Sequence, residues 1–445
     1  MKSYVPNAES ERLEMLNVIG LSSMDELFSD IPDELKLDRD LNIGDGMSEA
    51  ELRRVFLEYA KKNSSLPIFR GAGAYRHYIP SVIPHLLSRS EFYTAYTPYQ
   101  PEMSQGMLQS IFEYQTLICR LTGLDVSNAS VYDGATAAAE ATLMMRDAKR
   151  KAKILLSLGL APDVRATIKT YAHAAKIEIV EIPLDNTGRT DIEALRENAN
   201  GFAGAIIANP NFYGNLEDMT LLTNTVHELG GLMTSYVNPI SIGLIKRPGD
   251  YGADIAVGDA QPLGMPLMFG GPYCGFMCAT QKLIRNLPGR IAGQTCDKDG
   301  NRVFVLTLQA REQHIRREKA SSNICSNQML CAIMASMYLS VMGPSGMREV
   351  ANQNLQKAHY LAEGLSQIKG IKLRYENTPF FNEFVIDLDK DVIAVNAALK
   401  AKGYVGGLRL NYYGGNDNGM LICATEMNTR EEIDGLLAAL EEVMR

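Results

Sequence analysis

The chain has no tryptophan, only six histidines, and seven cysteines spread from Cys119 to Cys423. An odd number of widely spaced cysteines is not a disulfide framework. Cys274 and Cys278 lie four residues apart, with no His or further Cys nearby to complete a metal site. The sequence also lacks a GxxxxGK[ST] phosphate loop and a Gly-x-Ser-x-Gly elbow, so it belongs to neither of the enzyme classes that these motifs mark.

Basic residues are outnumbered along the 445-residue chain, where 44 Lys and Arg stand against 52 Asp and Glu for a formal charge of −8. This balance argues against binding to nucleic acid or to an anionic membrane. No run approaches the roughly 20 apolar residues that a membrane-spanning helix needs. The first residues, Met1–Pro6, contain no apolar signal-peptide core. We therefore expect a cytoplasmic protein in a reducing compartment.

Strand-like and helix-like segments alternate through the middle of the chain. Lys153–Ser157 is a short apolar strand, for example, and a helix is predicted to begin at Pro162. The alternation predicts a large α/β domain over residues 91–325, with a parallel-rich sheet covered on both faces. Residues 1–90 are predicted to form an N-terminal arm of short helices, and residues 326–445 a smaller α+β domain.

Two segments before residue 141 have unusual composition. Phe92–Glu102 contains three tyrosines at intervals of three, with two prolines. Rigid aromatic rings with hydroxyl groups suit a contact surface or a pocket wall, although a packed connector would look the same. In Asn128–Glu140 a turn of small residues opens a helix whose free N–H groups could hold an anion. Asp133, however, is placed to cap that helix, and its carboxylate would repel a phosphate.

Two further segments lie after residue 257. Gly258–Gly275 is rich in glycine and proline and follows a predicted strand, where irregular loops often line binding sites. It contains no lysine or histidine and only one carboxylate. Arg311–Lys319 is a run of charged residues that contains His314 and Arg316. Such a run is either a solvated face or a basic contact for a carboxylate or an acidic partner.

Four segments together resemble one protein family, the P-protein of the glycine cleavage system, and in particular its subunit 1 chains. They are Phe92–Gly106, Asn128–Glu140, Val257–Gly275 and Val305–Asn327. The resemblance implies a fold type I, aminotransferase-like α/β architecture. It also implies a role in decarboxylating glycine through pyridoxal phosphate, with transfer of the aminomethyl group to the lipoyl arm of H-protein.

The cofactor positions of the family are degenerate in this chain. A cofactor-bearing chain needs a lysine for the Schiff base and an aspartate facing the pyridinium nitrogen. Counted from Gly252-Ala253-Asp254, the lysine position is Pro262, and counted from Gly230-Gly231, the aspartate position is Tyr236. With Asp133 at the helix entrance, we expect no catalytic or cofactor-binding residue and no metal ligand here, and pyridoxal phosphate on subunit 2.

The expected partners are therefore subunit 2, lipoyl H-protein and the substrate glycine. The residues expected to cross the subunit interface, or to wall the partner's active site, are Tyr96, Thr97, Tyr99, Gln100, Glu102, His314 and Arg316. Two alternatives stay open. The chain could be a free-standing pyridoxal-phosphate enzyme that uses Lys246 or Lys282, or a structural or regulatory paralogue without a part in any active site.

Overall fold

The structure is a computed structural model that describes residues 8–320 and 322–445. The chain divides into two compact units, Met1–Ser65 and Leu66–Arg445. The division falls after Ser65, within the stretch 1–90 that the sequence analysis treats as one arm.

The first unit contains two α-helices, α1 (Glu9–Ile19) and α2 (Glu49–Lys61). Ser48 caps α2, because its hydroxyl accepts from the Glu51 backbone N–H while the Glu51 carboxylate accepts from the Ser48 N–H. The apolar residues Leu52, Phe56 and Tyr59 of this helix are exposed in the structure. A 3-10 turn, Asp25–Phe28, lies between the two helices.

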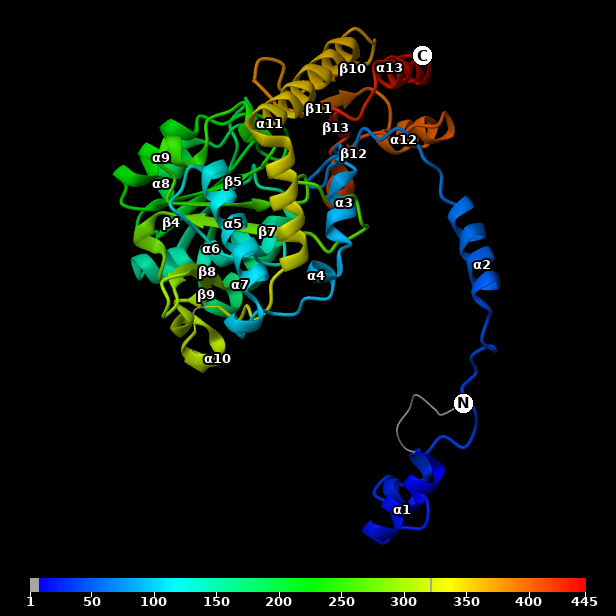
Figure 1. The fold of residues 1–445 in the computed structure, drawn as a ribbon. Helices are drawn as coiled ribbons and strands as arrows, with labels where there is room; N and C mark the ends of the chain where they lie inside the picture. The colour runs from blue at the N-terminus through cyan, green and yellow to red at the C-terminus, as the bar shows by residue number, and fades with distance from the viewer. Residues whose placement is uncertain (1–7, 321) are drawn as a thin grey trace. The chain divides into compact units, whose positions relative to one another are not determined.

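The second unit is built on a seven-stranded sheet of order β1-β7-β6-β5-β4-β2-β3 (Figure 1). Its strands are β1 (Val126–Ser127), β2 (Lys153–Ser157), β3 (Glu178–Ile182), β4 (Gly204–Asn209), β5 (Leu232–Val237), β6 (Ile255–Asp259) and β7 (Gly275–Ala279). Strands β2 to β6 are parallel to their neighbours in this group, and β7 is antiparallel to both β6 and β1. The predicted parallel-rich α/β sheet is confirmed.

Helices cover both faces of this sheet. They are α6 (Gly134–Lys149) and α7 (Pro162–Ala175) on one face, and α8 (Ile192–Asn198) and α9 (Met219–Glu228) on the other. Two neighbouring residues of β4 show why the strand is a continuous apolar run. Ile206 packs in the hydrophobic core between the sheet and α6, and Ile207 packs in the core between the sheet and α9. A strand buried on both faces does not alternate in polarity.

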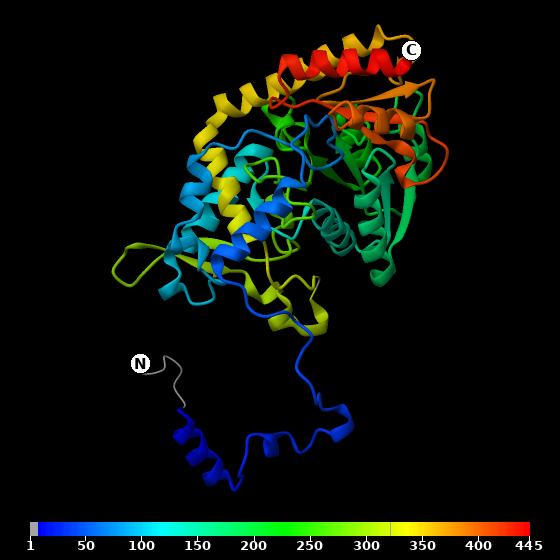
Figure 2. The same cartoon turned by 90° about the vertical axis from the view of Figure 1, so that its right-hand side faces the viewer.

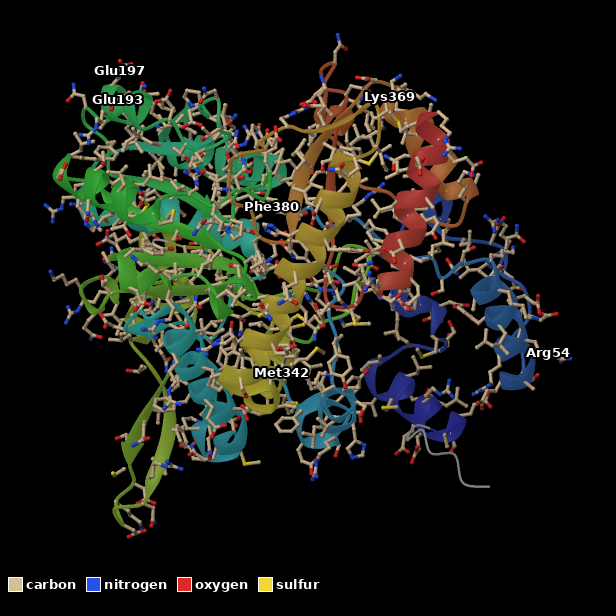
Figure 3. All side chains as sticks on the ribbon, turned by 90° about the horizontal axis from the view of Figure 1, so that it is seen from above. Arg54, Glu193, Glu197, Met342, Lys369 and Phe380 are labelled. Atoms are coloured by element: carbon tan, nitrogen blue, oxygen red, sulfur yellow. The ribbon has the colours of Figure 1, made fainter. Side chains whose placement is uncertain are left out.

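Residues 82–122 and 291–316 add elements around the sheet. The helices are α3 (Val82–Leu87), α4 (Ser90–Tyr93), α5 (Gln105–Thr122) and α10 (Gln313–Arg316). Helix α5 ends where expected, because Gly123 takes the left-handed conformation with φ 74°. The antiparallel hairpin of β8 (Ile291–Cys296) and β9 (Arg302–Thr307) was not predicted, and it projects from the body (Figure 3).

The C-terminal region forms a second, antiparallel sheet of order β10-β11-β13-β12. Its elements are β10 (Ile371–Leu373), β11 (Glu383–Leu388), α12 (Val392–Ala401), β12 (Leu408–Arg409), β13 (Gly419–Cys423) and α13 (Arg430–Met444). Helix α13 lies beside the second half of the long helix α11 (Figure 2). This arrangement is the smaller α+β layer that the sequence predicts.

Helix α11 (Met329–Ser366) joins the two sheets. It is kinked at Gly343, whose φ of 59° and ψ of −177° are not helical, directly after Met342 (Figure 3). By length and composition alone α11 could cross a membrane. Tyr338 before the kink and Ala358 after it are fully buried, however, each in a different hydrophobic core of this unit. A core helix of a globular unit accounts for these observations.

Candidate functional site

The first candidate site lies beyond the carboxyl ends of the parallel strands, where ligands bind in open α/β sheets. We call this cavity of about 270 Å³ the Tyr236 cavity. Tyr236 comes from β5, Asp259 ends β6 and Pro262 follows it in the loop, while Asp133 precedes α6 and Glu383 begins β11. The three positions that the sequence analysis derived separately, Asp133, Tyr236 and Pro262, thus line the same cavity.

The N-terminus of α6 points its N–H groups at carboxylates of this chain. Asp133 Oδ1 accepts from the Thr136 N–H at 2.7 Å, and Asp259 Oδ2 accepts from the Gly134 N–H at 2.9 Å. A Cβ at Gly134 would lie 2.6 Å from the Tyr236 hydroxyl, so the helix end, the tyrosine and Asp259 are closely packed. Two of the N–H groups that would bind an anion at this helix N-terminus are therefore already occupied.

Carboxyl groups dominate the cavity. Asp133, Asp163, Asp259 and Glu383 line it, and none of its lining residues in the described structure is a lysine, arginine or histidine. Burial raises the pKa of Asp259 to about 6, although N–H groups of Gly134 and Gln261 act in the opposite direction. Burial likewise raises the pKa of Glu383 to about 7, against the hydrogen bond from Tyr75. Burial thus shifts the titration of both acids toward neutral pH.

This set of side chains does not fit pyridoxal phosphate. A Schiff base needs an amine, and Pro262 stands where the lysine is expected. Tyr236 cannot supply the negative charge that stabilises a protonated pyridine, since burial raises the pKa of its hydroxyl still further. The phosphate would meet Asp133 and Asp259 in place of free N–H groups. No catalytic step is therefore derived from this cavity.

The segment Ala72–Tyr75 forms part of the cavity wall and is firmly held. The Ala72 N–H and the Tyr75 hydroxyl each donate to Glu383, both at 2.6 Å. The side-chain amide of Gln261 accepts from the Tyr75 N–H and donates to the Tyr75 carbonyl, each at 2.8 Å. Sequence gave no sign of Glu383 as the acceptor.

The two lysines considered as alternatives lie elsewhere. Lys246 is exposed and lines a separate cavity beside Tyr251, and Lys282 is exposed on a 3-10 turn, Gln281–Leu283. Neither lysine lines the Tyr236 cavity. The geometry therefore offers no support for a Schiff base at either position.

A second cavity, of about 520 Å³, gathers several of the residues expected at a subunit interface. We call it the Arg290 cavity, and its lining residues are Tyr99, Arg290, Glu312, Gln313, His314, Arg317, Glu318, Ile324 and Cys325. The structure thus brings Tyr99 and His314 together from segments more than 200 positions apart. Arg316 lines a smaller neighbouring cavity with Arg311. Tyr96, Thr97, Gln100 and Glu102 line neither cavity.

Arg290 links the tyrosine segment to the body. Its Nη2 donates to the Tyr99 hydroxyl at 3.0 Å, and its guanidinium carbon lies 5.1 Å from the centre of the Tyr99 ring. Tyr99 nevertheless remains 53% exposed and Tyr96 84% exposed, so most of this aromatic surface has no cover within the described chain. Sequence analysis missed Arg290, because an isolated arginine after Pro288-Gly289 has no pattern that distinguishes it from a surface residue.

A sheet of mainly parallel strands, covered on both faces and joined to a small C-terminal domain, defines the fold type I architecture of pyridoxal-phosphate enzymes. Solved structures of that class share it. The sphingosine-1-phosphate lyase of Burkholderia pseudomallei aligns with a TM-score of 0.65 over 92% of both chains. At 13% identity this similarity concerns the fold alone.

The chain belongs to the family "Glycine cleavage system P-protein", whose sequence profile matches residues 2–440. It is 52% identical to the "Probable glycine dehydrogenase (decarboxylating) subunit 1" of Moorella thermoacetica, over 99% of this chain and 100% of the relative. A protein of the same description from Brevibacillus brevis is 48% identical, over 99% of both chains. The crystal structure of an inhibitor-bound glycine decarboxylase (P-protein) aligns with a TM-score of 0.91 and 42% identity, over 99% of this chain and all of that one. The predicted family and fold are confirmed.

Proposed function

We propose that this chain is the subunit of a two-chain glycine decarboxylase that carries no cofactor. With subunit 2 it would decarboxylate glycine and pass the aminomethyl group to lipoyl H-protein, in the cytoplasm. Pyridoxal phosphate, the electron sink of this chemistry, would be bound by subunit 2. The observation that supports the proposal is the Tyr236 cavity, which is lined by a proline, a tyrosine and carboxylates and by no lysine among the described residues.

The contribution of this chain would be a wall of the partner's active site, made by Tyr96–Glu102 together with His314 and Arg316. Pro98 and Pro101 restrict the backbone of the segment, so docking costs little conformational entropy. Tyr96 is largely exposed and free to contact a partner. Tyr99 has a double role, since its ring packs on Arg290 while about half of its surface stays open. Contacts from another subunit would order loops of the partner that must close over glycine.

A structural or regulatory paralogue is the remaining alternative. It would predict that the aromatic segment and the Arg290 cavity are covered by their own chain. The exposure of Tyr96, at 84%, favours an external partner for the segment.

The exchange of labelled bicarbonate into glycine tests the proposal. The exchange is measured for this chain, for subunit 2 and for their mixture, with H-protein present in each. We expect no exchange from this chain, weak exchange from subunit 2, and full exchange from the mixture. Full exchange from subunit 2 alone would make this chain a bystander, and exchange by this chain alone would require a cofactor site that its side chains do not provide.

A further inference from the structure

Arg290 is a buried cation without a counter-ion. Only 4% of its surface is exposed, and it forms no ion pair among the described residues. Its hydrogen-bond partners are neutral: the Tyr99 hydroxyl at 3.0 Å and, at 3.5 Å, the side-chain oxygen of Asn327. Its Nε–H has no hydrogen-bond partner in the described chain. An unpaired buried charge is costly, so a site that retains one is expected to have its anion supplied from outside.

Arg290 also lines the open volume of the Arg290 cavity, so an anion has room to reach it. Two carboxylates line the same cavity, Glu312 and Glu318. Glu312 lies 3.7 Å from His314 Nδ1, and neither acid pairs with Arg290. The cavity therefore contains carboxylates, but neither of them pairs with the buried Arg290 guanidinium.

A second, partly buried guanidinium lines the smaller neighbouring cavity. Arg311 donates to the carbonyl oxygens of Leu308 and Gly289, and its Nη1 has no partner in the described chain. Burial lowers the pKa of Arg311, which still leaves a guanidinium charged at neutral pH. Arg311 thus bonds to the carbonyl of Gly289, the residue before Arg290, but it lines the neighbouring cavity and not the Arg290 cavity.

We propose that the Arg290 cavity is an oxyanion-binding subsite. The free Nε–H and the remaining hydrogen on Nη2 form one edge of the guanidinium, which can grip two oxygens of a carboxylate or a phosphate. The Tyr99 hydroxyl accepts from Nη2, so its own proton is free to donate to the same anion. The subsite deepens the proposed function, since an anionic group of the shared reaction would bind beside the exposed tyrosine segment. Binding to the free chain does not depend on that function.

The direct probe is the Nε–H resonance of Arg290 in the full chain, labelled with ¹⁵N in arginine only. The chain is titrated at constant ionic strength with inorganic phosphate, with acetate and with glycine. We expect one resonance, absent in Arg290→Lys, to shift to saturation. A response to phosphate alone identifies a phosphate group as the ligand chemistry, and a response to acetate or glycine identifies a carboxylate. If no anion moves the resonance, the proposal is overturned.

Variants at the exposed position 99 keep the test decisive even if Arg290→Lys does not fold. Tyr99→Glu places a carboxylate beside Arg290 and should compete with the external anion, weakening its binding roughly 10- to 100-fold. Tyr99→Gln has the same length without the charge and should weaken binding only a few-fold. Arg348→Gln, an exposed change on α11, should leave binding unchanged. Equal binding by Tyr99→Glu and Tyr99→Gln would contradict the proposal. Since only the free chain is used, failure here leaves the exchange result for the mixed subunits unaffected.

Discussion

The Tyr236 cavity and the Arg290 cavity differ in how their buried charged groups are stabilised. The Tyr236 cavity contains four carboxyl groups and no cation among its lining residues in the described chain. The Arg290 cavity is built around a buried guanidinium that no carboxylate neutralises. In the first, burial raises the pKa of Asp259 and of Glu383, and N–H groups of the chain donate to the carboxylates. In the second, no carboxylate of the described chain pairs with Arg290.

The difference indicates which of the two cavities is expected to bind an external ligand. A pocket whose donors and acceptors are already satisfied has little affinity left for a ligand. A pocket with an unpaired buried cation can bind an anion, because the anion replaces the stabilisation that the cation lost when it was removed from water. We therefore expect changes at the Tyr236 cavity to alter mainly stability, and changes near the Arg290 cavity to alter mainly association and binding.

The largest effect is expected from Glu383→Gln, and it depends on pH. The pKa of Glu383 is about 7 in the folded chain, above the ordinary value of 4.5. Between these values the folded state keeps a proton that the unfolded state has released, so this group's stabilisation falls as pH rises. The variant lacks this dependence of the free energy of unfolding on pH. Between about pH 4.5 and pH 7, its free energy of unfolding should therefore rise by on the order of 3 kcal/mol relative to that of the unchanged chain.

Denaturant unfolding of both proteins across this range measures the difference. Glu376→Gln, at an exposed position, is the matched control and should run parallel to the unchanged chain. Parallel curves for Glu383→Gln as well would mean that Glu383 is ionised in the folded chain and that the cavity is not neutralised by protonation.

The second effect concerns association. Tyr96→Ala should weaken binding to subunit 2 by ~2 kcal/mol, because a large exposed aromatic ring is a typical interface anchor. The melting temperature of the free chain should not change, since 84% of Tyr96 is exposed. Tyr412→Ala removes another exposed tyrosine, far from the segment in sequence, and should leave the affinity unaltered. A lower melting temperature with unchanged affinity would place the Tyr96 ring in its own chain's core.

A smaller effect is expected at the start of α6. Asp133→Ala removes the side chain that accepts from the Thr136 N–H, and loss of a helix cap costs about 1 kcal/mol. Asp133→Asn keeps an oxygen in the same place and should retain most of the stability. Thermal unfolding of the two variants makes the comparison. If both lose the same amount, the negative charge rather than the hydrogen bond stabilises the helix end.

No gain of function is expected from a lysine at position 262. Pro262→Lys supplies an amine, yet Asp133 and Asp259 still accept from N–H groups at the helix end and Tyr236 still lines the cavity. Titration with pyridoxal phosphate should produce no Schiff-base absorbance. A stoichiometric, borohydride-reducible adduct at position 262 would show that the lysine alone was missing and that the other substitutions are neutral.

Regular elements with strong periodicity could be predicted from the sequence. Strand β2 was expected at the residues where it lies, and Gly123 ends α5 as its position suggested. The hairpin of β8 and β9 was missed because its strands face solvent over part of their length and lack clear alternation. Strand β7 was missed because it begins at Gly275, the last residue of the glycine- and proline-rich segment that was interpreted as a loop, and its apolar run is short.

Residues of the candidate sites could likewise be predicted where the signal is local in sequence, and not where it depends on distant partners. Asp133 could be identified as a cap because a cap is a local signal, fixed by a few residues of chain. Glu383 and Arg290 could not be identified, since their roles depend on partners 308 and 191 positions away. Asp259 stood out only as the single carboxylate of its loop, and its bond to Gly134 spans 125 positions. Contacts of this kind arise from the packing of the whole domain.

Borohydride reduction of the assembled, glycine-active enzyme is the most direct test of the central claim, that this chain completes an active site without holding the cofactor. After reduction the two subunits are separated and digested, and phosphopyridoxyl peptides are mapped by mass spectrometry. The account predicts a stoichiometric adduct on one lysine of subunit 2 and none on this chain. An adduct on a defined lysine of this chain would contradict it.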